Sequence, residues 1–337
     1  MAVSHLKINV IMGVKMIGLL LLLLAGVCQG SFGIGYKKYH PFAWEVFWAL
    51  YTVFCFIMSL IWTTIKVPDW YNYIGITGSG PIFTAILCGV VWGISAIYFT
   101  MSIDIIGMSL VYGISMGVST IAGSLLPLII NKNLPSGNSV FYLAVGLFIS
   151  LIGIGVITLA GMKRDGKEVK SNTKKGIIFA VVSGLGSGAM NLGFNATTPI
   201  GDAVKYVGYD RTGASALGWM LVIFGGLLIT EVYCIYRMLK NKSYITIRVK
   251  GAGSRSLKLF ITSIVWFMAL LLYGIATYML GDFGSVIGWI LFNALALMIS
   301  SGWGLILGEW KSSSEARKLL FIGNAILVGA WFFIANV

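Results

Sequence analysis

Two carboxylates stand inside long apolar stretches, Glu45 and Glu231, and they are the residues of this sequence best suited to proton chemistry. At a rise of 1.5 Å per residue, Glu231 is expected ~9 Å and Glu45 ~12 Å from the middle of its apolar helix. A carboxylate held in such a helix can gain and lose a proton, so both are predicted to be proton-coupling groups. The alternative is an interfacial ion pair, of Glu231 with Arg237 or of Glu45 with Lys37 or Lys38.

A second set of side chains could bind a small polar molecule such as a sugar. Amides and hydroxyls hydrogen-bond to sugar hydroxyls, and aromatic rings cover the apolar face of the sugar ring. The candidates lie away from the ends of the apolar stretches: Gln29, Ser31, Trp92, Tyr112, Ser115, Asn191, Asn195, Trp289 and Asn293. An unpaired amide is costly in lipid, so the amides must face protein or a cavity. Their alternative role is hydrogen bonding between neighbouring helices, and for Trp92 it is core packing.

The sequence lacks the motifs of membrane-embedded enzymes. It contains no H-E-x-x-H, no Asp-rich motif and no cluster of carboxylates, which a lipid-modifying enzyme would gather at one membrane face. The four cysteines lie in apolar runs at no metal-like spacing. We therefore expect no catalytic residues, no metal and no cofactor, and we keep an integral-membrane lipid-modifying enzyme only as a distant alternative.

The chain that must position these residues is too apolar for a water-soluble globule. Of its 337 residues, 58% are hydrophobic and 10% are charged, against about 25% charged in soluble domains. A bilayer core needs about 20 apolar residues per helix, and their backbone groups must be bonded within the segment. The sequence therefore predicts an all-α integral membrane protein with ten transmembrane helices. They are expected at 16–34, 42–65, 82–103, 106–130, 139–161, 175–195, 213–238, 256–280, 282–308 and 316–336.

The basic residues indicate how the chain is oriented. The net charge is +13, which in a soluble protein would suggest a nucleic-acid partner. Three quarters of the 24 Lys and Arg residues fall in the five odd-numbered connections between the expected helices. The positive-inside rule then places these connections in the cytoplasm and both termini outside. We expect a multi-pass protein of the cell inner membrane, with the lipid bilayer as a partner and no nucleic acid.

The chain also carries signs of an internal repeat. The first and sixth expected helices share glycines four and five apart, followed by an aromatic residue: Gly26, Gly30, Gly35, Tyr36 and Gly184, Gly188, Gly193, Phe194. The alternative is two independent glycine packing faces. Because five is an odd number, two five-helix units must insert with opposite orientation, which is the inverted-repeat plan of secondary transporters. The sequence predicts a first repeat at 1–161, a basic cytoplasmic connection at 162–174 and a second repeat at 175–337.

Several longer stretches carry a family resemblance. They are GSFGIGYKKYHPFAWEVFW (Gly30–Trp48), GVVWGISAIYFTMSIDIIGMSLVYGISMGVSTIAGSLLPLIIN (Gly89–Asn131), GLFISLIGIGVITLAG (Gly146–Gly161) and GEWK (Gly308–Lys311). In order and spacing, over nearly the whole chain, they resemble the L-rhamnose–proton symporter family of the drug/metabolite transporter superfamily. The resemblance implies ten helices in two five-helix repeats and cation-coupled uptake of a deoxysugar. It fades in the seventh and eighth expected helices and at the start of the ninth, so the substrate stays open.

These observations together predict a secondary active transporter for a small polar solute. We expect it to move L-rhamnose or a related sugar across the inner membrane by proton symport and alternating access. Sodium is the alternative coupling ion, and export of a metabolite or amino acid is the alternative activity within the superfamily. The transporter is expected to be a monomer or a homodimer.

Overall fold

The computed structural model describes residues 2–36, 40–130, 132, 134–166, 173–281, 283–311 and 313–337. These residues form helices and no strand. Ten helical spans are long and apolar enough to cross a membrane, which confirms the predicted fold class. The elements are α1 (Ala2–Ser31), α2 (Gly33–Tyr36), α3 (Trp44–Lys66), α4 (Tyr71–Ile74), α5 (Ser79–Ile106), α6 (Met108–Ile130), α7 (Asn138–Asp165), α8 (Thr173–Ala196), α9 (Thr198–Tyr206), α10 (Arg211–Asn241), η1 (Ser243–Arg248), α11 (Ala252–Leu280), α12 (Gly284–Ile306) and α13 (Ser314–Ile334).

The short connections after the third and eighth spans are sharp reversals, as their lengths predict. Only Gly107 separates α5 from α6, and its φ of 82° lies in the left-handed region that glycine adopts without strain. The two helices of this hairpin diverge, because α8 packs against both of them. α11 and α12 are likewise joined by a few residues around Gly281, which also has a positive φ of 88°.

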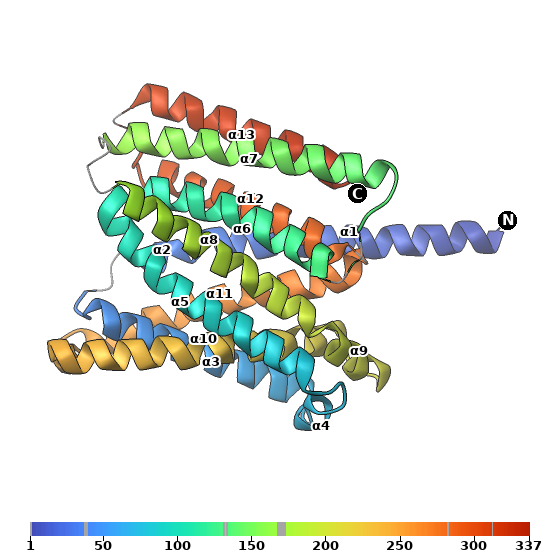
Figure 1. Ribbon diagram of the computed structural model, residues 1–337, viewed down its shortest axis with the longest axis horizontal. Helices are drawn as coiled ribbons and strands as arrows, with labels where there is room; N and C mark the ends of the chain where they lie inside the picture. The colour runs from blue at the N-terminus through green and yellow to red at the C-terminus, as the bar shows by residue number, and fades with distance from the viewer. Residues whose placement is uncertain are drawn as a thin grey trace.

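The spans alternate in direction, so all odd-numbered connections meet at one end of the molecule, on the left in Figure 1. We call this the basic end. Side chains join the connections there: Ser109, at the start of α6, donates to Asp165 of α7, and Arg164 pairs with Glu309 beyond α12 at 3.3 Å. At the opposite end, Tyr209 before α10 donates to Asp69 after α3. This alternation of directions is what ten successive spans joined by connections at alternate ends produce.

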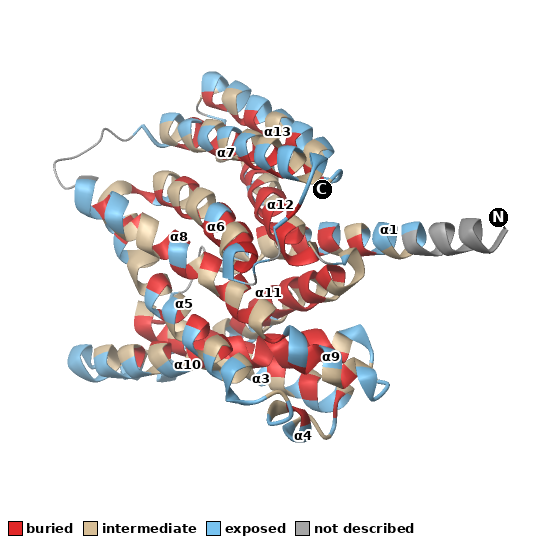
Figure 2. Ribbon diagram, turned by 45° about the vertical axis from the view of Figure 1, so that its right-hand side comes forward, coloured by how far each residue is buried: buried red, intermediate tan, exposed pale blue. Residues whose placement is uncertain are grey.

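The spans form a central group of six helices between two flanking pairs (Figures 1 and 2). α7 and α13 pack together on one flank, and α3 and α10 pack together on the other. Between them lie α1, α5, α6, α8, α11 and α12. The core runs through α12, α11 and the adjoining α10: 72%, 61% and 56% of their most apolar segments are buried, against 28% for α13 (Figure 2). Side chains in the centre must therefore satisfy their polar groups within the protein.

Glycine sets the distance between the centre and one flank. A Cβ added to Gly89 of α5 would lie 2.0 Å from the carbonyl oxygen of Val222 in α10. One added to Gly225 of α10 would lie 2.1 Å from the carbonyl oxygen of Ile86. Only glycine allows the two backbones to touch in this way.

Candidate functional site

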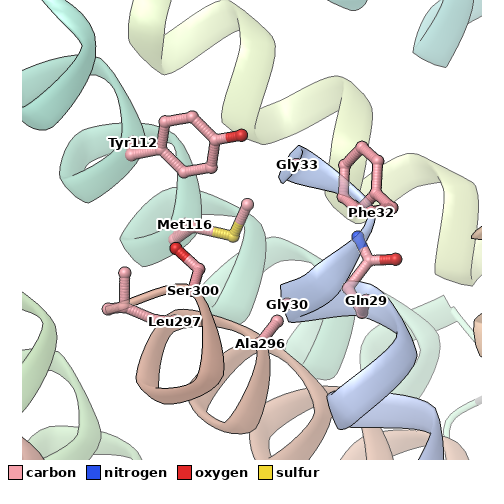
Figure 3. Close-up of a pocket in the computed structure, with 9 residues that line it drawn as sticks. All are labelled: Gln29, Gly30, Phe32, Gly33, Tyr112, Met116, Ala296, Leu297 and Ser300. Carbon is pink, nitrogen blue, oxygen red and sulfur yellow. The ribbon is translucent and has the colours of Figure 1, made fainter. Parts of the chain in front are cut away.

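A small cavity lies between the end of α1, α2, the first turns of α6 and the second half of α12 (Figure 3). Its volume is about 40 Å³. Its walls are formed by Gln29, Gly30, Phe32, Gly33, Tyr112, Met116, Ala296, Leu297 and Ser300. The fold thus brings together two residues from the predicted set, Gln29 and Tyr112, which are far apart in the sequence.

The polar groups of this cavity suit a neutral hydroxylated ligand. The Tyr112 hydroxyl extends across the cavity toward α2, and Ser300 and Met116 stand beside it (Figure 3). The Oε1 atom of Gln29 is buried, and among the described residues it has no hydrogen-bond partner. A buried acceptor without a partner is rare in proteins, because it has lost its hydration without compensation. The wall of the cavity therefore includes an acceptor that no described protein group satisfies.

A polar seam runs from this cavity along the facing sides of α6 and α12. Trp289 Nε1 donates to the carbonyl oxygen of Ser119 at 3.0 Å, and Asn293 Nδ2 donates to Thr120 Oγ1 at 3.3 Å. The two helices are antiparallel here, so Trp289 and Asn293 lie farther from the basic end than the cavity does. Both side chains are buried and hydrogen-bond across the helix interface.

Beyond the seam, Asn191 joins α8 to three other helices. Its Nδ2 donates to the carbonyl oxygens of Gly123, at 2.8 Å, and Ser285, at 3.1 Å. Its Oδ1 accepts from the Tyr273 hydroxyl at 2.6 Å. Asn195, one turn along α8, donates to Ser285 Oγ at 2.7 Å. These amides join α8 to its neighbours, which is the packing role left open from the sequence.

The remaining predicted ligand residues lie outside the cavity. Ser115 donates to Ser183 Oγ at 3.0 Å and so links α6 to α8. Ser31 accepts from Trp303 Nε1 at 2.9 Å beside a second, wider hollow. Trp92 stacks on Trp266, with ring centroids 5.4 Å apart and planes 13° from parallel. Three of the predicted positions are thereby occupied in contacts between helices.

The two carboxylates lie together on one flank, between α3 and α10. Thr52 of α3 donates to Glu231 Oε1 at 2.6 Å. In the described part of the chain no cation forms an ion pair with Glu231, so the alternative pairing with Arg237 is absent there. Neither carboxylate lines the cavity.

Glu45 accepts hydrogen bonds from more side chains than Glu231 does. Its Oε1 accepts from Asn241 Nδ2 at 2.9 Å and from Ser243 Oγ at 2.6 Å, and its side chain is 4% exposed. Arg237 lies close enough to interact with it electrostatically. The expected alternative partners, Lys37 and Lys38, lie outside the described residues.

Sequence reasoning missed three polar or polarisable contributors to these sites. Ser300 and Met116 line the cavity, and Thr52 holds Glu231. Met116 could have been found, because it lies four residues from Tyr112 and therefore on the same helix face. Thr52 is a hydroxyl in the middle of an apolar helix, which is also a readable signal. Among the described residues, no group of three or more His, Cys, Asp and Glu side chains could hold a metal ion.

The sequence comparisons with known proteins agree on one family. The sequence model of the family described as L-rhamnose-proton symport protein matches residues 10–335. An L-rhamnose-proton symporter of Citrobacter koseri is 25% identical over 324 residues, covering 91% of this chain and 93% of the relative. One of Salmonella paratyphi A is 26% identical over 326 residues with the same coverage. A solved crystal structure shares the fold with a TM-score of 0.60 at 13% identity, over 94% of this chain and 95% of that one.

Proposed function

The chain belongs to the L-rhamnose-proton symport protein family, and from this premise we propose that it imports a neutral sugar together with a proton. L-rhamnose or a related deoxysugar is the proposed substrate, because the curated relatives are L-rhamnose-proton symporters. The proposed membrane is the inner membrane. The observation that carries the binding site is the buried, unpartnered Oε1 of Gln29 at the wall of a cavity that also contains hydroxyl groups.

The cavity offers both kinds of contact that a deoxysugar needs. Sugar hydroxyls would donate to Gln29 Oε1 and exchange hydrogen bonds with Tyr112 and Ser300. The apolar side of the sugar, with its methyl group, would pack on Phe32 and Met116. The polar seam along α6 and α12, with Trp289 and Asn293, would extend this site as the helices move apart.

Binding requires the cavity to widen. One water needs about 10–15 Å³ of such space, so a cavity of about 40 Å³ holds a few waters and excludes a hexose. The cavity lies among the last turns of α1, the second half of α12 and the first turns of α6, toward the basic end. We infer that α1, α6 and α12 separate to admit and release the sugar, as alternating access requires.

The pairing of the helices supports two inverted repeats, at 1–161 and 175–337. The first span, α1, packs against α11 and α12, and the sixth span, α8, packs against α5 and α6. Interchanging the two repeats span by span replaces α1 with α8, α5 with α11 and α6 with α12. Each of these two sets of contacts then becomes the other. The interchange also maps the pair α3–α10 onto itself, and the pair α7–α13 likewise. Such exchange is what a twofold axis in the membrane plane produces, and rocking of the units about it would switch access.

Glu231 is the favoured proton carrier, with Glu45 as the second candidate. A proton carrier must gain and lose its proton during each transport cycle, so few hydrogen bonds should stabilise either its charged or its neutral form. Glu231 is held by Thr52, whereas Glu45 is held by two donors and lies near Arg237. The basic end would face the cytoplasm, since it contains most of the Lys and Arg residues.

The binding site is tested by Gln29→Leu, with Asn324→Leu as the matched control. Asn324 Oδ1 is also buried without a partner among the described residues, but it belongs to α13 and does not line the cavity. In proteoliposomes, loss of the Gln29 acceptor should raise the KM for L-rhamnose by about tenfold, because a sugar hydroxyl is left unpaired. Asn324→Leu should leave KM unchanged. Equal effects of the two variants would exclude this cavity as the binding site.

The substrate is tested by the thermal stability of the purified protein in the presence of single sugars. L-rhamnose and related 6-deoxyhexoses should raise the melting temperature, and the increase should disappear in Gln29→Leu. Stabilisation by amino acids with no response to any sugar would favour the exporter alternative.

A further inference from the structure

A wider hollow lies next to the cavity and shares Phe32 with it. It is bounded by the end of α1 with α2, the first turns of α11 and the residue that follows α12. Its volume is about 490 Å³, more than ten times that of the cavity. Its apolar wall includes Ile34, Ile261, Val265 and Leu307.

Two cations also line this hollow, Arg255 and Lys258. They are three residues apart on α11 and therefore share a helix face. Among the described residues neither forms an ion pair, and no carboxylate lines the hollow. Elsewhere at the basic end, Arg164 pairs with Glu309. The hollow therefore has an unneutralised positive charge next to an apolar wall.

The apolar wall of the hollow continues onto the lipid-facing surface. Ile261 and Leu307 are each 52% exposed, and Ile34 is 39% exposed. In a membrane-spanning chain, such side chains contact acyl chains. From Arg255 to Val265 the helix rises ~15 Å, which is half of a hydrocarbon core of ~30 Å. The hollow thus extends from a charged group at the basic end to about the depth of one leaflet.

We propose that this hollow binds an anionic phospholipid of the leaflet at the basic end. The phosphate would lie between Arg255 and Lys258, and an acyl chain would follow Ile261 and Val265. This chemistry fits an amphiphile with one negative group, whereas a neutral sugar gains little from two cations. The site is independent of the proposed transport function, because a lipid could bind there whatever the protein carries.

The preceding segment places the same surface at the headgroup level. η1 exposes Tyr244, Ile245 and Ile247 beside the exposed Arg248. Apolar and basic side chains exposed together are typical of a segment that lies in the interface of a membrane containing anionic lipid. The chain therefore enters α11 from the region where lipid phosphates are found.

The proposal can be tested by native mass spectrometry of the purified full-length protein. Phosphatidylglycerol and phosphatidylcholine with identical acyl chains are titrated separately. The protein should bind phosphatidylglycerol more tightly. In R255Q/K258Q its affinity should fall by about thirtyfold, since each cation near an anionic lipid contributes about fivefold. The control R317Q/K318Q removes two exposed charges from the start of α13, which does not line the hollow, and should keep the affinity of the unsubstituted protein.

Two further measurements keep the test decisive if the double variant does not fold. Val265→Trp fills the apolar part of the hollow, keeps both cations and should also weaken phosphatidylglycerol binding. Inorganic phosphate and glycerol phosphate should not displace the lipid. Equal binding of the two lipids, equal losses in both double variants, or displacement by free phosphate would each overturn the proposal. The last result would instead indicate a site for a soluble anion.

Discussion

The two pairs of helices that flank the central six differ in chemistry. α7 and α13 meet through glycine: a Cβ on Gly323 would lie 3.0 Å from the backbone nitrogen of Ile157, and one on Gly153 would lie 2.7 Å from Leu327 Cδ2. Their charges lie at the basic end, where Lys163 pairs with Glu315. This flank is an apolar, closely packed pair whose outer face is exposed to lipid.

The other flank contains ionisable and aromatic groups within its spans. α3 contains no glycine. Its contacts with α10 include the hydrogen bond from Thr52 to Glu231 and the edge contact of Trp44 with Tyr233, whose ring centroids are 6.3 Å apart. A carboxylate at this depth is costly in a membrane and needs a compensating role. The proposed ion coupling is therefore placed on α3–α10.

The largest expected effect is that of Glu231→Gln on accumulation. A gradient of about two pH units can drive about hundredfold sugar accumulation in proteoliposomes, because each unit is a factor of ten. The variant should lose this accumulation and keep counterflow exchange, which needs no net proton movement. The measurement is uptake of labelled L-rhamnose with an imposed pH gradient, beside a parallel sodium gradient.

Glu315→Gln makes the same change in the other flanking pair and serves as the control. Because Glu315 lies at the exposed basic end, accumulation should persist. Full accumulation by Glu231→Gln, or equal loss in both variants, would break the assignment of coupling to α3–α10. Accumulation driven by sodium alone would replace the proton as the coupling ion.

The next effect is on stability and concerns the glycine contacts of α7–α13. Gly323→Leu should lower the free energy of unfolding by about 2 kcal/mol, since the added side chain has no space against Ile157. Gly329→Leu is the control on the same helix, because nothing lies within 4 Å of its Cβ position. Thermal unfolding of the purified protein measures both. Similar melting temperatures for the two variants would mean that this flank is not held by close glycine packing.

A smaller effect is expected for Glu45→Gln. The amide oxygen can still accept from Asn241 and Ser243, but the charge that favours these bonds and faces Arg237 is lost. Stability should fall by about 1 kcal/mol, and proton-driven accumulation should remain. Loss of accumulation in Glu45→Gln with normal accumulation in Glu231→Gln would exchange the roles of the two carboxylates.

The smallest effect concerns the link between α3 and α10 at the end opposite the basic end. Tyr209 and Tyr73 both donate to Asp69. These bonds lower the pKa of Asp69 and raise the pKa of Tyr209 to about 12. The contribution of Asp69 to the free energy of unfolding is present above its unfolded pKa, ~3.9, and is lost as the pH falls through its lower folded pKa. That of Tyr209 is present below the unfolded pKa, ~10, and is lost as the pH rises through about 12.

Melting temperature as a function of pH tests this link. The unsubstituted protein should lose stability in the acid and alkaline ranges, and Tyr209→Phe should reduce the alkaline loss between pH ~10 and the folded pKa of Tyr209. The difference in melting temperature between the two proteins should not change with pH near neutrality. If the difference in melting temperature between the two proteins changes between pH ~6 and ~8, another titrating group must be responsible.

The sequence predicted the class of fold and the family because both depend on local or linear information. Runs of apolar residues are local, and each of the ten expected spans corresponds to a span of the structure. Ends were less certain: the seventh span was expected at 213–238 and extends over Arg211–Asn241. The family resemblance rested on the order of motifs, which needs no knowledge of contacts, and the match over residues 10–335 confirms it.

The candidate site was less predictable, because depth in the membrane is readable from a sequence and helix neighbours are not. Gln29 and Tyr112 were chosen as polar residues within spans, and the fold places them at one cavity. Asn191 was chosen for the same reason, and it hydrogen-bonds to backbone carbonyls and Tyr273 instead. The roles of these residues in transport stay predictions.

By itself, the sequence determined that the chain crosses a membrane ten times and that most of its cations lie at one end. Hydropathy and segment length determine the number of crossings. Because alternate connections lie at the same end, the position of each Lys or Arg between the spans determines its end of the molecule. Only the tertiary structure decided that Glu45 and Glu231 share the α3–α10 flank and that Gln29 and Tyr112 line one cavity. The physical reason is that a lipid-embedded helix is stable in many surroundings, and packing with residues distant in the chain selects its neighbours.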